Sequence, residues 1–165
     1  MNDISIGSTD ELVQRLAKVL IAKEALMVTA ESCTGGLLGA AITSQPGVSS
    51  WFRGAMVVYH NELKIDWLGV PEEVIQRDGA VSKTCALEMA RAVRLKAEAT
   101  LGVGLTGIAG PSGATPDKPV GLLFLALSAE NREKCLEIRL SGNRDEIREN
   151  AVTHALQAIL EDCRR

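Results

Sequence analysis

Segments of helical periodicity alternate along this chain with short runs of apolar and β-branched residues. Apolar residues recur at helical spacing within 10–25, 37–42, 72–77, 83–96 and 145–163. Strand-like runs cover 26–30, 54–59, 101–105, 120–128 and 134–140, the last two separated only by a polar turn. Alternating helices and strands favour parallel pairs with crossover helices, whereas a short turn favours an antiparallel hairpin. We therefore predict an α/β fold: a single three-layer α/β/α domain over 1–165, its mixed, partly parallel sheet covered by helices on both faces.

Length, charge and hydropathy favour a single-domain protein that binds neither nucleic acid nor membranes. A chain of 165 residues with 46% hydrophobic residues can remove roughly 69% of its accessible surface from water on folding, which suits one domain. The 18 basic and 21 acidic side chains give a net charge of −3, so no general attraction to nucleic-acid phosphates is expected. No apolar stretch approaches the roughly 20 residues that cross a bilayer, and the polar first ten residues do not resemble a signal peptide. We expect a cytoplasmic protein without nucleic-acid or membrane partners.

The four cysteines lie far apart in the sequence. Cys33, Cys85, Cys135 and Cys163 form no C-x-x-C pair and have no histidine at ligand spacing. We therefore predict reduced thiols, with Cys85 and Cys135 in packing positions, and neither a metal nor another cofactor.

Two predicted strands end in loops of small residues. These loops are Glu31-Ser-Cys-Thr-Gly-Gly36 and Thr106-Gly-Ile-Ala-Gly-Pro111. Open α/β sheets bind ligands where the carboxyl ends of strands face a crevice, and the amides of a helix starting near Gly35 could hold a phosphate or an oxyanion. Each loop taken alone could equally be a tight turn, because neither matches a known phosphate-binding pattern.

Ser32 is the candidate nucleophile, since it lies at a strand-to-helix turn. A serine needs a base. Of the two histidines, His60 follows a strand and His154 falls on the apolar face of the last helix, where we expect it to be packed in the core. Lys64, in the first turn of a short helix that Asn61 could cap, is the alternative base. Bringing its pKa from about 10.4 to near 7 costs about 4 to 5 kcal/mol, so it would have to be partly buried.

Structural or surface roles, with no part in catalysis, remain open for these residues. Lys64 could be a solvated surface charge, and Glu31 could orient Ser32 or simply cap the helix. Cys33 is a second candidate nucleophile, ranked below Ser32 because a cysteine beside two glycines is more often a packing residue. Arg144 and Arg148, four residues apart, could clamp a phosphate or face solvent.

Six motifs extend over nearly the whole chain in a fixed order. They are Ala30-Glu-Ser-Cys-Thr-Gly-Gly36, Gly47-Val-Ser-Ser-Trp-Phe52, Tyr59-x-x-x-x-Lys64, Gly79-Ala-Val-Ser82, Thr106-Gly-Ile-Ala-Gly-Pro111 and Lys118-Pro-Val-Gly121. Together they resemble the C-terminal domain of CinA proteins, whose stand-alone members are nicotinamide-nucleotide amidases.

The resemblance implies a metal-free hydrolase that converts the carboxamide of nicotinamide mononucleotide, its small-molecule substrate, to nicotinate mononucleotide and ammonia. Ser32 would be the nucleophile and Lys64 its base, with Tyr59 and Thr106 as further catalytic groups. Oxyanion donors would be the amides of Thr34 to Gly36, or the Thr106 hydroxyl and the Gly107 amide. The remaining substrate-binding positions implied are Glu31, Cys33, Thr34, Gly35, Gly36, Ser49, Gly107, Ala109, Gly110 and Arg144. A homodimer is also implied.

The chain departs from the family pattern at two places. The family usually has Gly-Pro-x-Gly-Gly where this chain has Gly110-Pro-Ser-Gly-Ala114, and often Gly-Asp-Arg where it has Gly142-Asn-Arg144. The pterin-binding-like domain that precedes this module in many relatives is absent here, so we expect a stand-alone amidase. Two alternatives remain: a non-catalytic nucleotide-binding module, and a hydrolase that uses Ser32 and Lys64 on another amide or ester.

Overall fold

The computed structural model describes residues 7–164. They contain one five-stranded sheet, with the strands in the order β2-β1-β3-β4-β5. The strands are β1 (Met27–Glu31), β2 (Phe52–Val57), β3 (Leu101–Gly107), β4 (Leu122–Ala129) and β5 (Arg132–Arg139). β1 pairs in parallel with both β2 and β3, whereas β3, β4 and β5 pair antiparallel. The predicted mixed sheet and the hairpin are confirmed, and the hairpin turn is shorter than expected because the two strands extend to residues 129 and 132.

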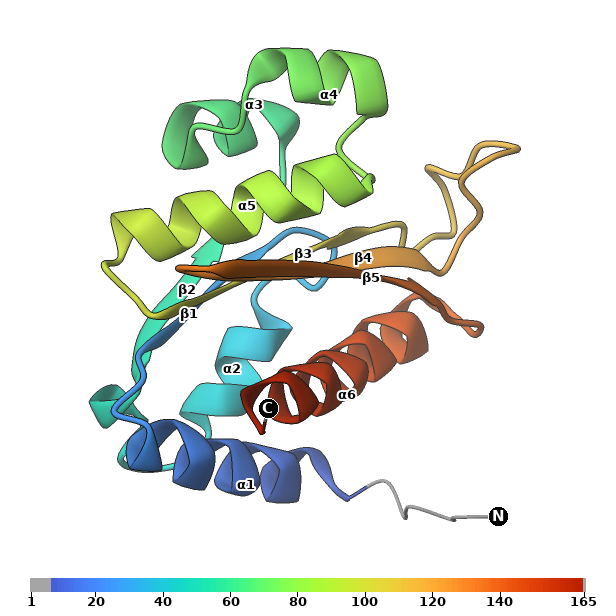
Figure 1. Ribbon diagram of the computed structural model, residues 1–165. Helices are drawn as coiled ribbons and strands as arrows, with labels where there is room; N and C mark the ends of the chain where they lie inside the picture. The colour runs from blue at the N-terminus through green and yellow to red at the C-terminus, as the bar shows by residue number, and fades with distance from the viewer. Residues whose placement is uncertain (1–6, 165) are drawn as a thin grey trace.

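Helices cover both faces of the sheet, as predicted (Figure 1). α5 (Lys83–Lys96) lies across one face, and the segment containing α3 (Asn61–Leu63), the π-helical turn η2 (Lys64–Leu68) and α4 (Glu72–Asp78) packs over it. α2 (Leu37–Thr43) and α6 (Arg144–Cys163) cover the other face. α1 (Thr9–Ala22) packs mainly against α6, on the side away from the sheet.

Two glycines bring α5 close to the sheet. A Cβ at Gly102 or Gly104 of β3 would collide with the carbonyl oxygen of Ala90 or Ala86 on α5. Only glycine leaves room for helix backbone to rest on strand backbone at this spacing. The α5 side of the sheet is therefore rigidly packed next to the carboxyl end of β3.

Serine side chains cap two of the helices. Ser8 caps α1 in a capping box with Glu11, and Ser82 caps α5 by accepting the Cys85 amide at 3.1 Å. The predicted Asn61 cap is wrong: α3 starts one residue earlier, at a His60 N-cap whose side chain makes no capping hydrogen bond.

The predicted packing of His154 is also wrong. The buried arc of α6 is centred near Val152, Ala155 and Ile159, and His154 lies just outside it. The exposed His154 ring contacts the Asn150 carbonyl at 2.8 Å.

Candidate active site

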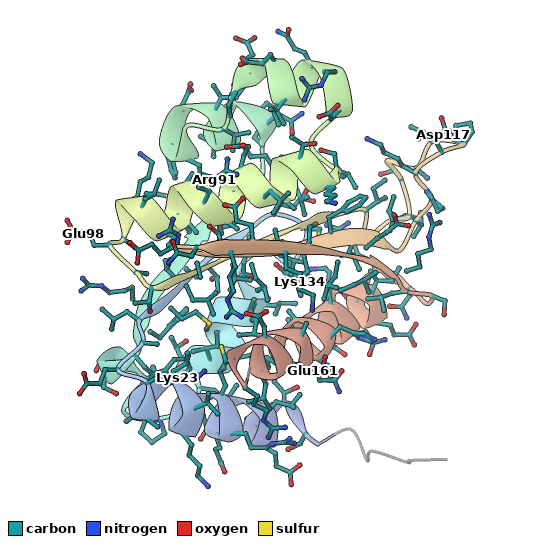
Figure 2. All side chains as sticks on the ribbon, in the orientation of Figure 1. Lys23, Arg91, Glu98, Asp117, Lys134 and Glu161 are labelled. Carbon is teal, nitrogen blue, oxygen red and sulfur yellow. The ribbon has the colours of Figure 1, made fainter. Side chains whose placement is uncertain are left out.

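Ser32 is the first residue beyond β1, and its amide donates to the Leu105 carbonyl of β3 at 3.0 Å. The carboxyl ends of β1 and β3 therefore meet at this point. A cavity of about 450 Å³ opens here, and the predicted site residues among its lining are Ser32, Cys33, Tyr59, Lys64, Thr106, Gly107, Ala109, Gly110 and Arg144. The loop after β3 supplies one wall through Ser112 and Gly113, and its tip at Asp117 projects beyond the end of the sheet (Figure 2).

Strand alternation sends Ser32 and Glu31 to opposite faces of the sheet. Val28 and Ala30 point into the core on the α5 side, and Ser32 continues their row. There it meets Lys64, which α3 and η2 carry back over the sheet. Glu31 instead continues the row of Met27 and Thr29, on the α2 side. The two neighbouring residues consequently have different surroundings and different tasks.

The Lys64 amine is buried against Ser32. Its side chain is 1% exposed, and Nζ lies 3.0 Å from Ser32 Oγ, 2.9 Å from the Val58 carbonyl oxygen and 3.0 Å from the Tyr59 carbonyl oxygen. No carboxylate of residues 7–164 forms an ion pair with it. Burial disfavours the ammonium form and lowers the pKa of Lys64 from its usual value. The reading of Lys64 as a solvated surface charge is therefore wrong.

The three neighbours of Nζ suit either protonation state of the amine. The two carbonyl oxygens can only accept hydrogen bonds, so each takes an N–H from Lys64 in both states. The third neighbour, the Ser32 hydroxyl, can accept from an ammonium or donate to the lone pair of a neutral amine. Moving one proton between Oγ and Nζ leaves the other two hydrogen bonds in place, which is the arrangement a nucleophile and its base require.

Cys33 lines the same cavity but is poorly suited to compete as nucleophile. Burial raises the pKa of its thiol to about 12. The thiolate is the reactive form of cysteine, so Cys33 stays protonated and inert near neutral pH.

The anion-holding role predicted for the amides near Gly35 is filled by the protein itself. The Glu31 carboxylate accepts hydrogen bonds from the amides of Gly36, Leu38 and Gly39 at 3.1, 3.1 and 2.7 Å. Glu31 is fully buried, and neither it nor Thr34, Gly35 or Gly36 lines the cavity. The expectation that the amides of Gly35 and Gly36 bind a ligand is corrected, because the first donates to the Ser32 carbonyl oxygen and the second to Glu31.

The second predicted oxyanion group also has a partner. Thr106 Oγ1 donates to the Ala80 carbonyl oxygen at 2.9 Å, so its proton points away from a ligand. The Gly107 amide is placed differently. In the β3–β4 ladder Ile108 donates to Leu122, so by alternation Gly107 directs its N–H to the β1 side, where β1 has already ended. Gly107 is therefore the better placed donor of the two.

Arg144 bridges the mouth of the cavity. Its guanidinium donates to the Gly110 carbonyl oxygen at 2.6 Å and to the Tyr59 hydroxyl at 3.0 Å. Arg148 does not share this position: it donates to the Thr34 carbonyl oxygen at 3.0 Å, in the turn after Ser32. Of the two arginines, only Arg144 lines the cavity.

Ser49 is not brought to the site. It lies in the short helix η1 (Val48–Ser50), which precedes β2. Because β2 is parallel to β1, the start of β2 lies beside the start of β1, whereas Ser32 follows the carboxyl end of β1. A contact between Ser49 and a ligand at Ser32 within one chain is ruled out by this topology.

Several further residues line the cavity that the sequence does not identify as ligand-binding. Asn61 was interpreted only as a helix cap, and Ala80 and Val81 come from the Gly79-Ala-Val-Ser82 motif, to which no role was assigned. The signal for Ala80 and Val81 was that motif itself. Asn61 could have been found from its place one turn before Lys64.

Comparison with known proteins places the chain in a family. The model of the CinA C-terminal domain matches residues 9–163. This chain belongs to the CinA C-terminal domain family. A CinA-like protein of Dictyoglomus thermophilum is 43% identical over 160 residues, which cover 96% of this chain and 39% of that relative. The chain thus spans about two fifths of that longer CinA-like protein.

Solved structures of the CinA superfamily have the same fold. The competence/damage inducible protein CihA of Agrobacterium tumefaciens is 38% identical, with a TM-score of 0.91 and coverage of 96% of this chain and 97% of that one. A CinA superfamily protein of Klebsiella pneumoniae is 31% identical, with a TM-score of 0.92 and coverage of 96% and 99%. Within residues 7–164 of this CinA domain, no helix has both the length and the apolar character needed to span a membrane.

Proposed function

We propose that this protein is a nicotinamide-nucleotide amidase, which hydrolyses the carboxamide of nicotinamide mononucleotide to nicotinate mononucleotide and ammonia. The observation that carries the proposal is the 3.0 Å contact between Ser32 Oγ and a buried Lys64 amine that has no carboxylate partner among the described residues. Such a pair supports acyl transfer through a serine ester. The choice of substrate rests on the resemblance to stand-alone members of the family.

The proposed reaction has two halves. Ser32 Oγ attacks the carboxamide carbon while its proton passes to Lys64 Nζ, and the carbonyl oxygen becomes an oxyanion. When this intermediate collapses, the C–N bond breaks, Lys64 returns the proton to the leaving nitrogen, and ammonia departs. Water then attacks the Ser32 ester and gives one proton to Lys64, which passes it to Ser32 Oγ as the C–Oγ bond breaks and the hydroxyl is restored. The carboxylic acid released loses its remaining proton to solvent and becomes the carboxylate.

The cavity supplies groups for the charges that this route creates. The Gly107 amide, aimed at the end of β1, is the donor we assign to the oxyanion. Arg144, fixed across the mouth by Gly110 and Tyr59, is the cation that we assign to the substrate phosphate. The two assignments place the carboxamide at the base of the cavity and the phosphate at its rim.

The assay is ammonia release from nicotinamide mononucleotide by the purified protein, with Ser32→Ala as matched control. We expect turnover by the wild type, in the presence of a strong chelator as well, and none by Ser32→Ala. Binding without turnover by the wild type would instead support a nucleotide-binding module. Turnover of other carboxamides only would place the substrate elsewhere, and loss of activity in chelator restored by a divalent metal would overturn the Ser32 and Lys64 mechanism.

The family resemblance also supports a cytoplasmic homodimer that needs no cofactor. Sedimentation velocity at micromolar concentration tests the assembly. A mass near twice 17.6 kDa is expected, and a single species at the monomer mass would contradict it.

A further inference from the structure

A buried carboxylate lies directly behind the nucleophile, and the proposed reaction makes no chemical use of it. Glu31 is 0% exposed, and none of the ion pairs within residues 7–164 includes it. Isolated buried charges are costly unless hydrogen bonds compensate them. The position of Glu31, one residue before Ser32, therefore calls for a local explanation.

Hydrogen-bond donors surround the Glu31 carboxylate on all sides. Oε2 accepts from Thr34 Oγ1 at 2.6 Å and from the amides of Gly36 and Leu38, each at 3.1 Å. Oε1 accepts from the Gly39 amide at 2.7 Å and, more weakly, from Thr29 Oγ1 at 3.4 Å. Four of the five donors belong to the turn after Ser32 or to the start of α2. Only Thr29 belongs to the strand before it.

The turn after Ser32 is arranged around the Glu31 carboxylate. Residues 33–36 reverse direction with left-handed backbones at Gly35 (φ +61°) and Gly36 (φ +97°), and the amide of Gly36 donates to Glu31, as do those of Leu38 and Gly39 that follow. Ser32 is held at one end by the hydrogen bond that its amide donates to the Leu105 carbonyl oxygen. At the other end it is held by the turn, in which the Gly35 amide donates to the Ser32 carbonyl oxygen. The backbone on both sides of the nucleophile is thus fixed, and the second side is organised around the carboxylate.

We propose that Glu31 is a positioning residue, whose carboxylate holds the turn 33–36 and thereby fixes Ser32 relative to Lys64 and to the bound acyl group. The inference rests on the proposed serine mechanism. Glu31 acts through Ser32 and touches no substrate. It also occupies the amides that a substrate phosphate would otherwise use, so the phosphate is left to the Arg144 side of the cavity.

Glu31→Gln is the direct perturbation, because glutamine has the same shape and places one donor where an acceptor was. The less disruptive orientation keeps oxygen at the site of three donors and turns the amide nitrogen toward the Gly39 N–H, which then loses its acceptor. We expect kcat for nicotinamide mononucleotide to fall about a hundredfold, the scale of a misplaced catalytic group, with KM little changed. The inflection of the pH–rate profile should stay at the wild-type position, because burial, the main cause of the lowered pKa of Lys64, does not depend on Glu31.

Two threonines on the same carboxylate provide a matched pair. Thr34→Val removes the 2.6 Å contact from the turn, and Thr29→Val removes the 3.4 Å contact from the strand. Both side chains are fully buried and both substitutions replace a hydroxyl by a methyl group. We expect Thr34→Val to lower kcat and Thr29→Val to leave it near the wild-type value, even where urea denaturation shows similar losses of stability.

A second measurement does not depend on the substrate. The rate at which a small fluorophosphonate labels Ser32, followed by mass spectrometry, should fall in Glu31→Gln and Thr34→Val and not in Thr29→Val. Should the wild type label at Ser32 and fail to release ammonia from nicotinamide mononucleotide, the substrate proposal fails and the positioning role is still tested. Wild-type rates in folded Glu31→Gln, or equal losses in the two threonine variants, would overturn the positioning role whatever the substrate.

Discussion

The pH dependence of stability should carry the signature of the buried Lys64 amine. Burial lowers the pKa of Lys64 in the folded protein, whereas the unfolded chain returns it to 10.5. Between these two values the unfolded state binds more protons than the folded state, so the free energy of unfolding rises with pH. The destabilising effect is present in full below the folded-state pKa and disappears as the pH approaches 10.5.

Lys64→Met isolates this effect. Each unit by which the pKa is lowered corresponds to about 1.4 kcal/mol of unfolding free energy near neutral pH, which methionine would restore. Methionine also leaves the carbonyl oxygens of Val58 and Tyr59 without the amine that contacts them at 2.9 and 3.0 Å, at about 1 to 3 kcal/mol for each group that stays buried. Removing the buried amine stabilises the folded state, whereas the unpaired carbonyl oxygens destabilise it. Only the first of these two effects changes with pH.

Urea denaturation of the wild type and Lys64→Met at a series of pH values measures the difference. Cys33 and Cys85 have pKa values raised to about 12 and about 11, so their effect lowers stability as the pH rises above 9. The series should therefore end near pH 8.5, and the comparison of two variants removes most of the cysteine contribution. We expect wild-type stability to rise relative to Lys64→Met across this range. Parallel curves would refute the claim that the buried amine is deprotonated more easily in the folded protein.

Three further outcomes follow from the described contacts. At pH 7.5, iodoacetamide should leave Cys33 of the folded protein unmodified, because a thiol of pKa about 12 supplies almost no thiolate; modification at the rate of the denatured chain, seen by peptide mass spectrometry, would contradict this. Arg144→Met should raise KM for nicotinamide mononucleotide about ten- to hundredfold, the value of a lost charge-assisted contact, and leave KM for nicotinamide riboside unchanged; equal effects on both would refute the phosphate assignment. Gly104→Ala should cost about 1 to 3 kcal/mol in urea denaturation, because its Cβ meets the Ala86 carbonyl, and unchanged stability would show that α5 can move.

Periodicity and turn chemistry made the fold accessible from the sequence. Apolar runs such as Leu101-Gly-Val-Gly-Leu105 have the length and composition of buried strands, and Ser8 and Ser82 have the expected capping chemistry. Asn61 and His154 were misplaced for a shared reason. The Asn61 error is one residue in the start of a helix, and the His154 error is one position around a helix. Neither difference can be predicted from a single sequence.

The location of the candidate site and its two central residues, which the structure brings into contact, could be predicted from the sequence. Strand ends identified the Ser32 turn, and the spacing Tyr59-x-x-x-x-Lys64 identified the lysine through the family resemblance. Burial of the amine could not be predicted from the sequence. It depends on η2 packing over Val58 and Ala30, a tertiary contact that the residues around Lys64 do not indicate. The internal use of the α2 amides was not visible either, since a glutamate beside a glycine turn does not reveal which face it takes until the strand register is known.

The central claim is that Lys64 accepts the proton of Ser32. The pH dependence of Ser32 labelling by a small fluorophosphonate tests it most directly, in the wild type and in Lys64→Arg, whose side chain stays protonated in proteins. The account predicts a wild-type rate that rises with pH through an inflection well below 10.5, and a Lys64→Arg variant that is folded and slow to label at every pH. Labelling of Lys64→Arg at the wild-type rate, or an inflection at 10.5 in the wild type, would contradict it.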